Sequence, residues 1–146
     1  MESNQTNQDN RPLRILASHP DTGTLRLIRD SISNLLNIEV DTSPSSEYAF
    51  ELAVKRHYSL FLFGIDMPNL NGQLLYDMLF TIYPKIHPEV PSFPGVVFIG
   101  NENESIKSDE IRKDARVKDF IIRPLSIDRI VRVVKNSIQV DESWFN

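Results

Sequence analysis

The chain has 146 residues, a length that suits one domain built around a single hydrophobic core. Hydrophobic residues make up 40% of it and charged residues 25%, and the net charge of −4 gives no electrostatic reason for nucleic-acid binding. Without cysteine, the chain cannot form disulfides, thiolate metal sites or cysteine nucleophiles. No apolar run approaches the length of a membrane span. A chain without cysteine is compatible with the reducing cytoplasm, where we expect this protein.

The two ends of the chain differ in composition from its middle. Residues 1–12 are polar and lack the basic start and apolar stretch of a signal peptide, so we expect a disordered leader there. Residues 13–140 are predicted to form the domain. Residues 141–146 make a short tail, in which Trp144 and Phe145 stand among polar neighbours. We leave open whether this tail is a contact element.

The first predicted unit is a strand over Leu13 to Ala17 followed by a helix. Asp21 or Thr22 is suited to cap the start of this helix, and Asn37 is suited to end it. Its predicted inner face consists of apolar residues at helical spacing: Leu25, Ile28, Ile32, Leu35 and Leu36.

The second unit begins with Ile38 to Thr42, which alternates like an edge strand. Ser45 or Ser46 is expected to start the second helix, which carries Ala49, Leu52 and Ala53. Leu60 to Ile65 is apolar throughout, as a central parallel strand buried on both faces would be.

A third helix is predicted after the turn at Asn71-Gly72. Its predicted inner face is Leu74, Leu75, Met78, Leu79 and Ile82. Four prolines are expected to end this helix and to make a loop of about ten residues, whose role as a contact element is left open: Pro84, Pro88, Pro91 and Pro94.

The last two units complete the pattern. Gly95 to Ile99 is another buried strand, whereas Asn101 to Ala115 is polar and predicts only a poorly anchored fourth helix. Phe120 to Ile122 is a short strand that ends at Arg123-Pro124. Ser126 is expected to cap a final helix with the inner face Ile127, Ile130, Val131, Val134 and Ile138.

Five strand-then-helix units in series predict an α/β domain with a doubly wound parallel sheet and helices on both faces. In such folds, ligands bind at the carboxyl ends of the strands. The informative positions are therefore those that directly follow each strand: Ser18 to Asp21, Gly64 to Pro68, Gly100 to Asn101, and Arg123-Pro124.

Two of these strand ends resemble the receiver domains of two-component response regulators. Tyr58 to Gly72 reads YSLFLFGIDMPNLNG, similar to the receiver strand that ends in a phosphoacceptor aspartate before Met-Pro and a glycine. Val117 to Pro124 reads VKDFIIRP, similar to the receiver strand that ends in Lys-Pro. The resemblance covers Leu13 to Ile138 and implies a five-stranded flavodoxin-like fold of order 2-1-3-4-5. It also implies a cis peptide bond before Pro124.

The reactive positions of the family are replaced in this chain. Under the resemblance, the phosphoacceptor falls on Gly64, the two Mg²⁺-binding acids fall on His19 and Pro20, and the hydroxyl that senses the phosphoryl group falls on Gly100. The family's lysine falls on Arg123. These replacements are consistent with one another. Without a nucleophile or carboxylates for Mg²⁺, the hydroxyl and the lysine of the family have no phosphoryl group to contact. The resemblance therefore implies a pseudo-receiver with no catalytic activity, no metal and no cofactor.

The expected pocket is completed by Asp21, Asp66 and Pro124, and Phe120 is expected to be a switch or interface residue beside it. Asp21 and Asp66 lie near its mouth, and we expect Arg123 to reach one of them or to hold an anion, because a buried unpaired cation is costly. Phe120 matches the family's switch aromatic. Either its ring is held permanently inward or it is simply a core residue.

Three functions remain possible. The first is a phosphorylation-independent signalling module that binds protein partners, such as a histidine kinase, or forms a homodimer through its last helix and fifth strand. The second is a sensor of an anion or small molecule beside Arg123. The third is an unconventional receiver that is phosphorylated at Asp66 or Asp21.

Overall fold

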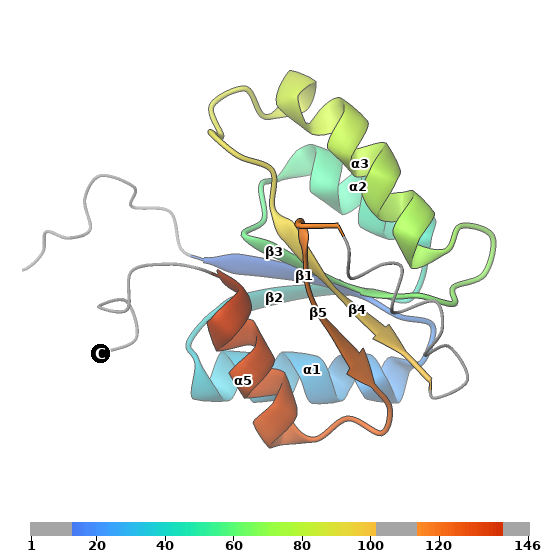
Figure 1. Ribbon diagram of the computed structural model, residues 1–146, viewed down its shortest axis with the longest axis vertical. Helices are drawn as coiled ribbons and strands as arrows, with labels where there is room; N and C mark the ends of the chain where they lie inside the picture. Colours follow the sequence, from blue (N-terminus) through green and yellow to red (C-terminus); the bar gives the residue numbers. More distant parts are fainter. Residues whose placement is uncertain (1–12, 102–113, 139–146) are drawn as a thin grey trace, which may run out of the picture.

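The computed structural model describes residues 13–101 and 114–138. Its five strands form one parallel sheet in the order β2-β1-β3-β4-β5, with helices on both faces (Figure 1). This confirms the predicted fold class and strand order. The described elements are β1 Arg14–Ser18, α1 Thr22–Leu35, β2 Glu39–Ser43, α2 Ser46–Lys55, β3 Leu60–Gly64, α3 Gly72–Ile86, β4 Gly95–Gly100, β5 Val117–Ile122 and α5 Ile127–Ile138.

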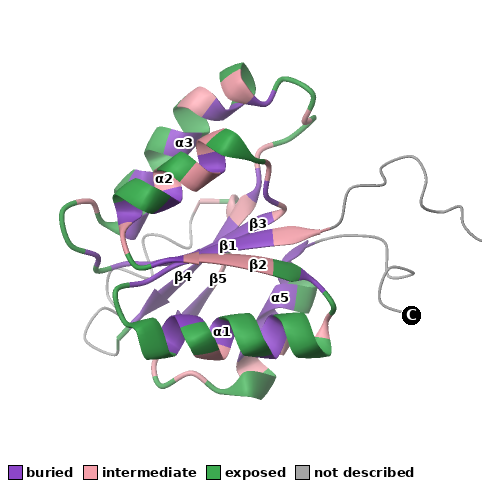
Figure 2. Ribbon diagram, turned by 180° about the vertical axis from the view of Figure 1, so that it is seen from behind, coloured by how far each residue is buried: buried purple, intermediate pink, exposed green. Residues whose placement is uncertain are grey.

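The sheet separates two hydrophobic cores. Helices α1 and α5 cover one face and α2 and α3 cover the other, and the buried residues lie in the sheet and on the helix faces that meet it (Figure 2). Strand β3 is buried along its whole length and serves both cores. Phe61 and Phe63 point to α2 and α3, whereas Leu60 and Leu62 belong to the core beneath α1 and α5. This alternation is the two-residue period of a strand.

Polar side chains begin the helices on the side of the sheet where the strands end. The carboxylate of Asp21, the hydroxyl of Ser45 and the amide oxygen of Asn71 each accept a hydrogen bond from a backbone N–H in the first turn of α1, α2 or α3. Asn37, just beyond α1, has φ of 56°, the left-handed conformation that ends many helices. Among the predicted alternatives, the structure thus has Asp21 and not Thr22, and Ser45 and not Ser46, as the caps, and it confirms Asn37 at the end of α1.

The predicted end of α3 is wrong. The helix continues through Pro84 and ends at Ile86, because a proline in the last turn removes only one N–H from the helical ladder. The connection to β4 is correspondingly shorter than expected.

The predicted inner face of α3 is also partly wrong. Leu74 and Met78 are exposed, and Tyr76 and Tyr83 are buried beside Leu79 instead. The tyrosines satisfy their hydroxyls inside the core, since Tyr76 donates to the Pro94 carbonyl at 2.8 Å and Tyr83 accepts from the N–H of Tyr58 at 3.0 Å. Apolar spacing alone does not reveal such partners.

The predicted inner face of α5 is partly wrong as well. Ile127 is exposed, and Val133 takes the inner position expected of Val131.

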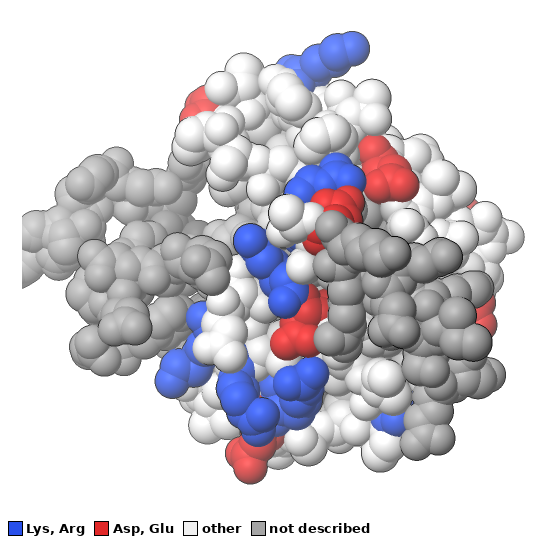
Figure 3. Space-filling model, viewed as in Figure 1, with Lys and Arg blue, Asp and Glu red and all other residues white. Residues whose placement is uncertain are grey.

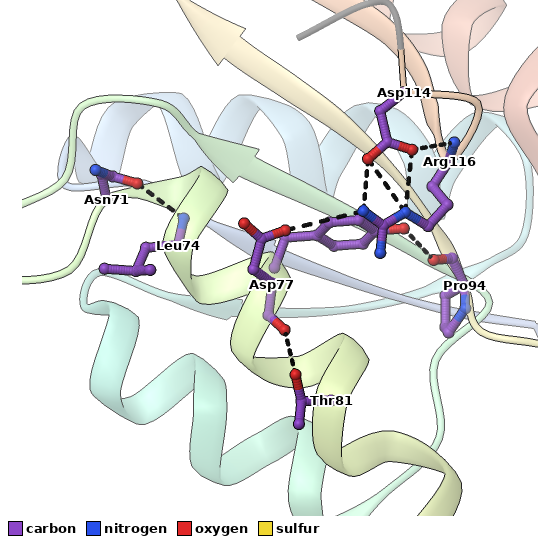
Figure 4. Close-up of polar contacts among 8 residues, drawn as sticks. Asn71, Leu74, Asp77, Thr81, Pro94, Asp114 and Arg116 are labelled. Carbon is purple, nitrogen blue, oxygen red and sulfur yellow. Dashed lines mark hydrogen bonds and ion pairs between the residues drawn. The ribbon is translucent and has the colours of Figure 1, made fainter.

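The side chain of Arg116, just before β5, contacts both Asp114 and residues of α3 (Figure 4). Its guanidinium forms a bidentate pair with Asp114 and lies 4.0 Å from a carboxylate oxygen of Asp77. The Cζ atom of Arg116 also lies 4.3 Å from the ring centroid of Phe80 and 5.3 Å from that of Tyr76. These contacts connect the start of the edge strand β5 with α3.

Three predictions fall on residues outside the described part of the chain: the leader at residues 1–12, most of the poorly anchored fourth helix, and the tail at residues 141–146. None of the helices within residues 13–101 and 114–138 is long and apolar enough to cross a membrane.

Candidate functional site

The predicted site residues meet where the parallel strands end. His19 and Asp21 follow β1, Gly64 closes β3, and Arg123 follows β5. Because neighbouring parallel strands end at the same edge of the sheet, residues more than one hundred positions apart come into contact. The side chain of Asp66 is exposed and makes no hydrogen bond or ion pair with the described residues.

The imidazole of His19 occupies the space beside Gly64. A Cβ atom built on Gly64 would lie 2.9 Å from Cδ2 of His19 and 3.4 Å from Cγ of Met67. The His19 ring is only 6% exposed. Two backbone contacts hold the residue: its N–H donates to the carbonyl of Ser43 at 3.1 Å, and its Nδ1 accepts from the N–H of Asp21 at 3.0 Å. The place where a longer side chain at position 64 would extend is therefore filled.

The environment of His19 favours the neutral ring. Burial lowers its pKa below 6.5, the Arg123 guanidinium lowers it further, and the carboxylate of Asp21 partly opposes both effects. Because a backbone N–H can only donate, the Nδ1 that faces Asp21 carries no proton, and the neutral ring has its proton on Nε2.

Asp21 links the cap of α1 to Arg123. Its Oδ2 accepts hydrogen bonds from the N–H of Thr24 at 3.2 Å and from the Thr24 hydroxyl at 2.6 Å, and these bonds hold the pKa of the carboxyl below its usual value. The same oxygen lies 3.3 Å from Nη2 of Arg123. The expected contact between Arg123 and Asp21 is thus present, and it is open to solvent, since the two side chains are 37% and 48% exposed.

Gly72 is required by the close approach of two backbone segments. A Cβ atom at this position would lie 2.0 Å from the carbonyl oxygen of Gly64, which belongs to rigid backbone. The N–H of Gly72 also donates to the carbonyl of Ile65 at 3.1 Å. The loop after β3 therefore folds back onto the end of that strand, and it does so at the Gly64 position.

Serine hydroxyls and Met67 fill the rest of the space near the ends of β1 and β2. The Ser18 hydroxyl lies 3.3 Å from the carbonyl of Ser45 and 3.6 Å from the sulfur of buried Met67. The Ser46 hydroxyl donates to the carbonyl of Leu70. Sequence reasoning missed this packing role, for which the only signal was Met67 within the Met-Pro motif.

The other predicted site residues are Pro20, Gly100, Pro124 and Phe120, and their contacts are with backbone or with the hydrophobic core where the structure gives any. Pro20 is exposed, and the carbonyl of Gly100 accepts from the N–H of Arg123 at 2.8 Å. The bond between Arg123 and Pro124 is cis. Phe120 is 1% exposed and lies in the core beneath α2 and α3. This position is compatible with a switch aromatic held permanently inward and equally with an ordinary core residue. Within the described ranges, no group of three or more His, Asp or Glu side chains is arranged to hold a metal ion.

The sequence matches no protein-family model and no curated protein. Solved structures, in contrast, are similar over most of the chain. The receiver domain of AraT, a response regulator from Geobacillus stearothermophilus, has 23% identity and a TM-score of 0.69, with 87% of this chain and 94% of that chain covered. The receiver domain of NtrX from Brucella abortus has 23% identity and a TM-score of 0.70, with coverages of 87% and 99%.

A third similar structure bears a different description, an adenylate cyclase from Rhodopirellula baltica, with 18% identity, a TM-score of 0.73 and coverages of 88% and 89%. At such identities the likeness concerns the fold. This chain has the α/β fold of response-regulator receiver domains.

Proposed function

We propose that the chain is a receiver-like signalling module that acts by binding a protein partner and does not depend on aspartyl phosphorylation. The observation that carries this proposal is the position of the His19 ring, which lies where a side chain on Gly64 would extend. A pocket packed in this way is suited to structural support. It is poorly suited to the entry of a phosphoryl donor.

The chemistry of the residues supports the same proposal. Aspartyl phosphorylation needs a carboxylate nucleophile, and Mg²⁺ needs oxygen ligands, usually carboxylates. The corresponding positions are Gly64, His19 and Pro20, none of which supplies a carboxylate. The neutral imidazole of His19 is a nitrogen donor, which suits transition metals better than Mg²⁺.

The two alternative acceptors are less suitable. Asp21 already caps α1, accepts two hydrogen bonds from Thr24 and lies against Arg123, so modification would disrupt its present contacts. Asp66 is exposed, and its carboxylate forms no hydrogen bond or ion pair with the described residues that would hold it in place for phosphoryl transfer. An anion sensor is likewise disfavoured, because the Arg123 guanidinium already contacts a carboxylate.

The direct test is to treat the chain with acetyl phosphate and Mg²⁺, and separately with beryllofluoride and Mg²⁺. The readouts are intact mass and amide NMR shifts, with an aspartate-containing receiver domain as the positive control. We expect neither a mass gain nor shifts around Gly64. A gain of one phosphoryl group that is lost in Asp66→Asn or Asp21→Asn would overturn the proposal and establish an unconventional receiver.

The partner is proposed to be a signalling protein such as a histidine kinase, or a second copy that pairs through α5 and β5. The edge position of β5 supports the second option, because an edge strand presents backbone groups to solvent. Size-exclusion chromatography with light scattering separates the two cases. A chain that stays monomeric at every concentration tested would contradict pairing through α5 and β5.

A further inference from the structure

A groove runs between α1 and α5, on the opposite side of the sheet from α2 and α3. Its part nearest the start of α5 has a volume of about 500 Å³ and includes Leu27 and Leu35 of α1 and Ile127 of α5. The adjoining part is formed by Leu35 together with Val131 and Arg132 of α5. Leu35 is 60% exposed and Ile127 is 47% exposed, so apolar side chains line the groove without being covered by the described residues.

The charged side chains of this groove carry a small excess of positive charge. Its basic side chains are Arg26, Arg132 and Lys135, and its acidic ones are Asp30 and Asp128. Arg132 and Lys135 form no ion pair with any residue in the described ranges. In Figure 3, Lys and Arg side chains gather over the region where Figure 1 places α5 and α1. An occupant with carboxylates and large apolar side chains would match both properties.

The residues that follow α5 have this composition. After Ile138 the chain reads QVDESWFN, which places the carboxylates of Asp141 and Glu142 just before Trp144 and Phe145. An extended chain spans at most about 3.3–3.6 Å per residue, so Trp144 can lie up to about 20 Å from Ile138. Going back along α5 from Ile138 to Arg132 takes only about 9 Å, at 1.5 Å per helical residue. The tail is therefore long enough to turn back along the groove.

We propose that the tail of this chain, Asp141 to Phe145, docks into the groove between α1 and α5. Trp144 and Phe145 cover Leu35 and the apolar wall, while Asp141 and Glu142 pair with Arg132 and Lys135. Aromatic side chains bury large apolar areas, and the ion pairs orient the segment. A protein that binds the α1 and α5 face must then displace this tail, which makes the tail a competitor for that face.

The test uses full-length chain and the fluorescence of Trp144, the single tryptophan of the sequence. Emission wavelength and acrylamide quenching are measured in wild type, in Leu35→Ser and in the double variant Arg132→Glu/Lys135→Glu. The matched control is Leu74→Ser, which changes an exposed leucine on α3, in the other helical layer. All of these substitutions are at exposed positions, so they are expected to leave the fold intact.

We expect shielded, blue-shifted emission in wild type and in Leu74→Ser. In Leu35→Ser the emission should shift to the red and the quenching constant should rise roughly two-fold or more, because the apolar contact is lost. The double charge variant should expose Trp144 in the same direction, and added salt should do so in wild type.

Two results would overturn the inference. One is fully solvated Trp144 emission in wild type with the same quenching in all variants. The other is shielding that disappears on dilution, which would show that the groove holds the tail of a second copy. The inference does not depend on the proposed function, because a chain that accepts a phosphoryl group could still dock its tail, and a chain that does not could leave it free.

Discussion

The ring of His19 and the missing side chain of Gly64 are complementary. His19 directly follows β1, and Gly64 is the last residue of β3. Because β1 and β3 pair in parallel, the two residues lie at the same edge of the sheet. The ring lies so close that a methyl group on Gly64 would approach its Cδ2 to 2.9 Å. The position of the His19 ring thus depends on Gly64, since the ring needs the space that the glycine leaves.

This relationship predicts energetic coupling between the two positions. Gly64→Ala should lower the free energy of unfolding by about 1–3 kcal/mol, as expected for overpacking. In a His19→Ala background, the same change should cost much less, because the ring is gone. Chemical denaturation of the four proteins in the cycle measures the difference. Gly23→Ala is the control, since its Cβ would meet nothing closer than 3.7 Å. Equal costs in both backgrounds would refute the coupling.

Gly72→Ala should be more damaging than Gly64→Ala. Its Cβ would lie 2.0 Å from the carbonyl oxygen of Gly64, and backbone at the end of a buried strand cannot move aside as a flexible side chain can. We expect a loss of at least about 3 kcal/mol of stability. Urea denaturation followed by circular dichroism gives the value, and Gln73→Ala, at the neighbouring exposed position, is the control. Wild-type stability in Gly72→Ala would show that the loop is free to rearrange.

The buried ring of His19 should make stability depend on pH. Its pKa is lower in the folded chain than the unfolded value of 6.5, chiefly because of burial and then because of Arg123. Between those two pKa values the unfolded chain binds more protons. The free energy of unfolding should therefore fall as the pH is lowered through 6.5, and the contribution should level off below the folded pKa.

His19→Gln isolates this contribution, because glutamine does not titrate and can still accept the hydrogen bond from the N–H of Asp21. Urea denaturation at a series of pH values should show a shallower fall for the variant than for wild type. The other histidines, His57 and His87, are present in both proteins and cancel in the comparison. Parallel curves would mean that His19 is protonated equally well in the folded and unfolded chains.

Arg116 should stabilise the domain through its geometry as well as its charge. Arg116→Ala removes a bidentate pair with Asp114 and the contacts with two aromatic rings, and should cost about 1–2 kcal/mol, a modest value because the side chain is 33% exposed. Arg116→Lys should recover only part of this, since an ammonium cannot reproduce the planar fork.

Thermal and urea denaturation of the Arg116 variants provide the measurement. Arg29→Ala serves as the control, because Arg29 is exposed and its nearest carboxylate, on Asp30, lies 3.7 Å away. That change should alter stability by no more than about 0.5 kcal/mol. Full recovery by Arg116→Lys would mean that charge alone accounts for the contribution.

Local sequence patterns were sufficient for the order of the elements. Short apolar runs separated by helical patterns predict alternating strands and helices, and handedness then restricts the sheet to few topologies. The caps at Asp21 and Ser45 and the helix end at Asn37 were also predictable, since each depends on one side chain and its immediate backbone. The receiver-like order of the strands followed from the Met-Pro and Arg-Pro segments together.

Tertiary structure decided which residues on a helix face inward and what fills the pocket. Leu74 is exposed, whereas Tyr83 is buried and its hydroxyl accepts a hydrogen bond from the N–H of Tyr58. No local pattern contains information about this distant partner. The sequence shows a glycine at position 64 and a histidine at position 19, but only the pairing of β1 with β3 places one against the other. Short-range preferences thus determined the elements of this protein, whereas contacts between distant residues determined its site, because those contacts exist only once the sheet has formed.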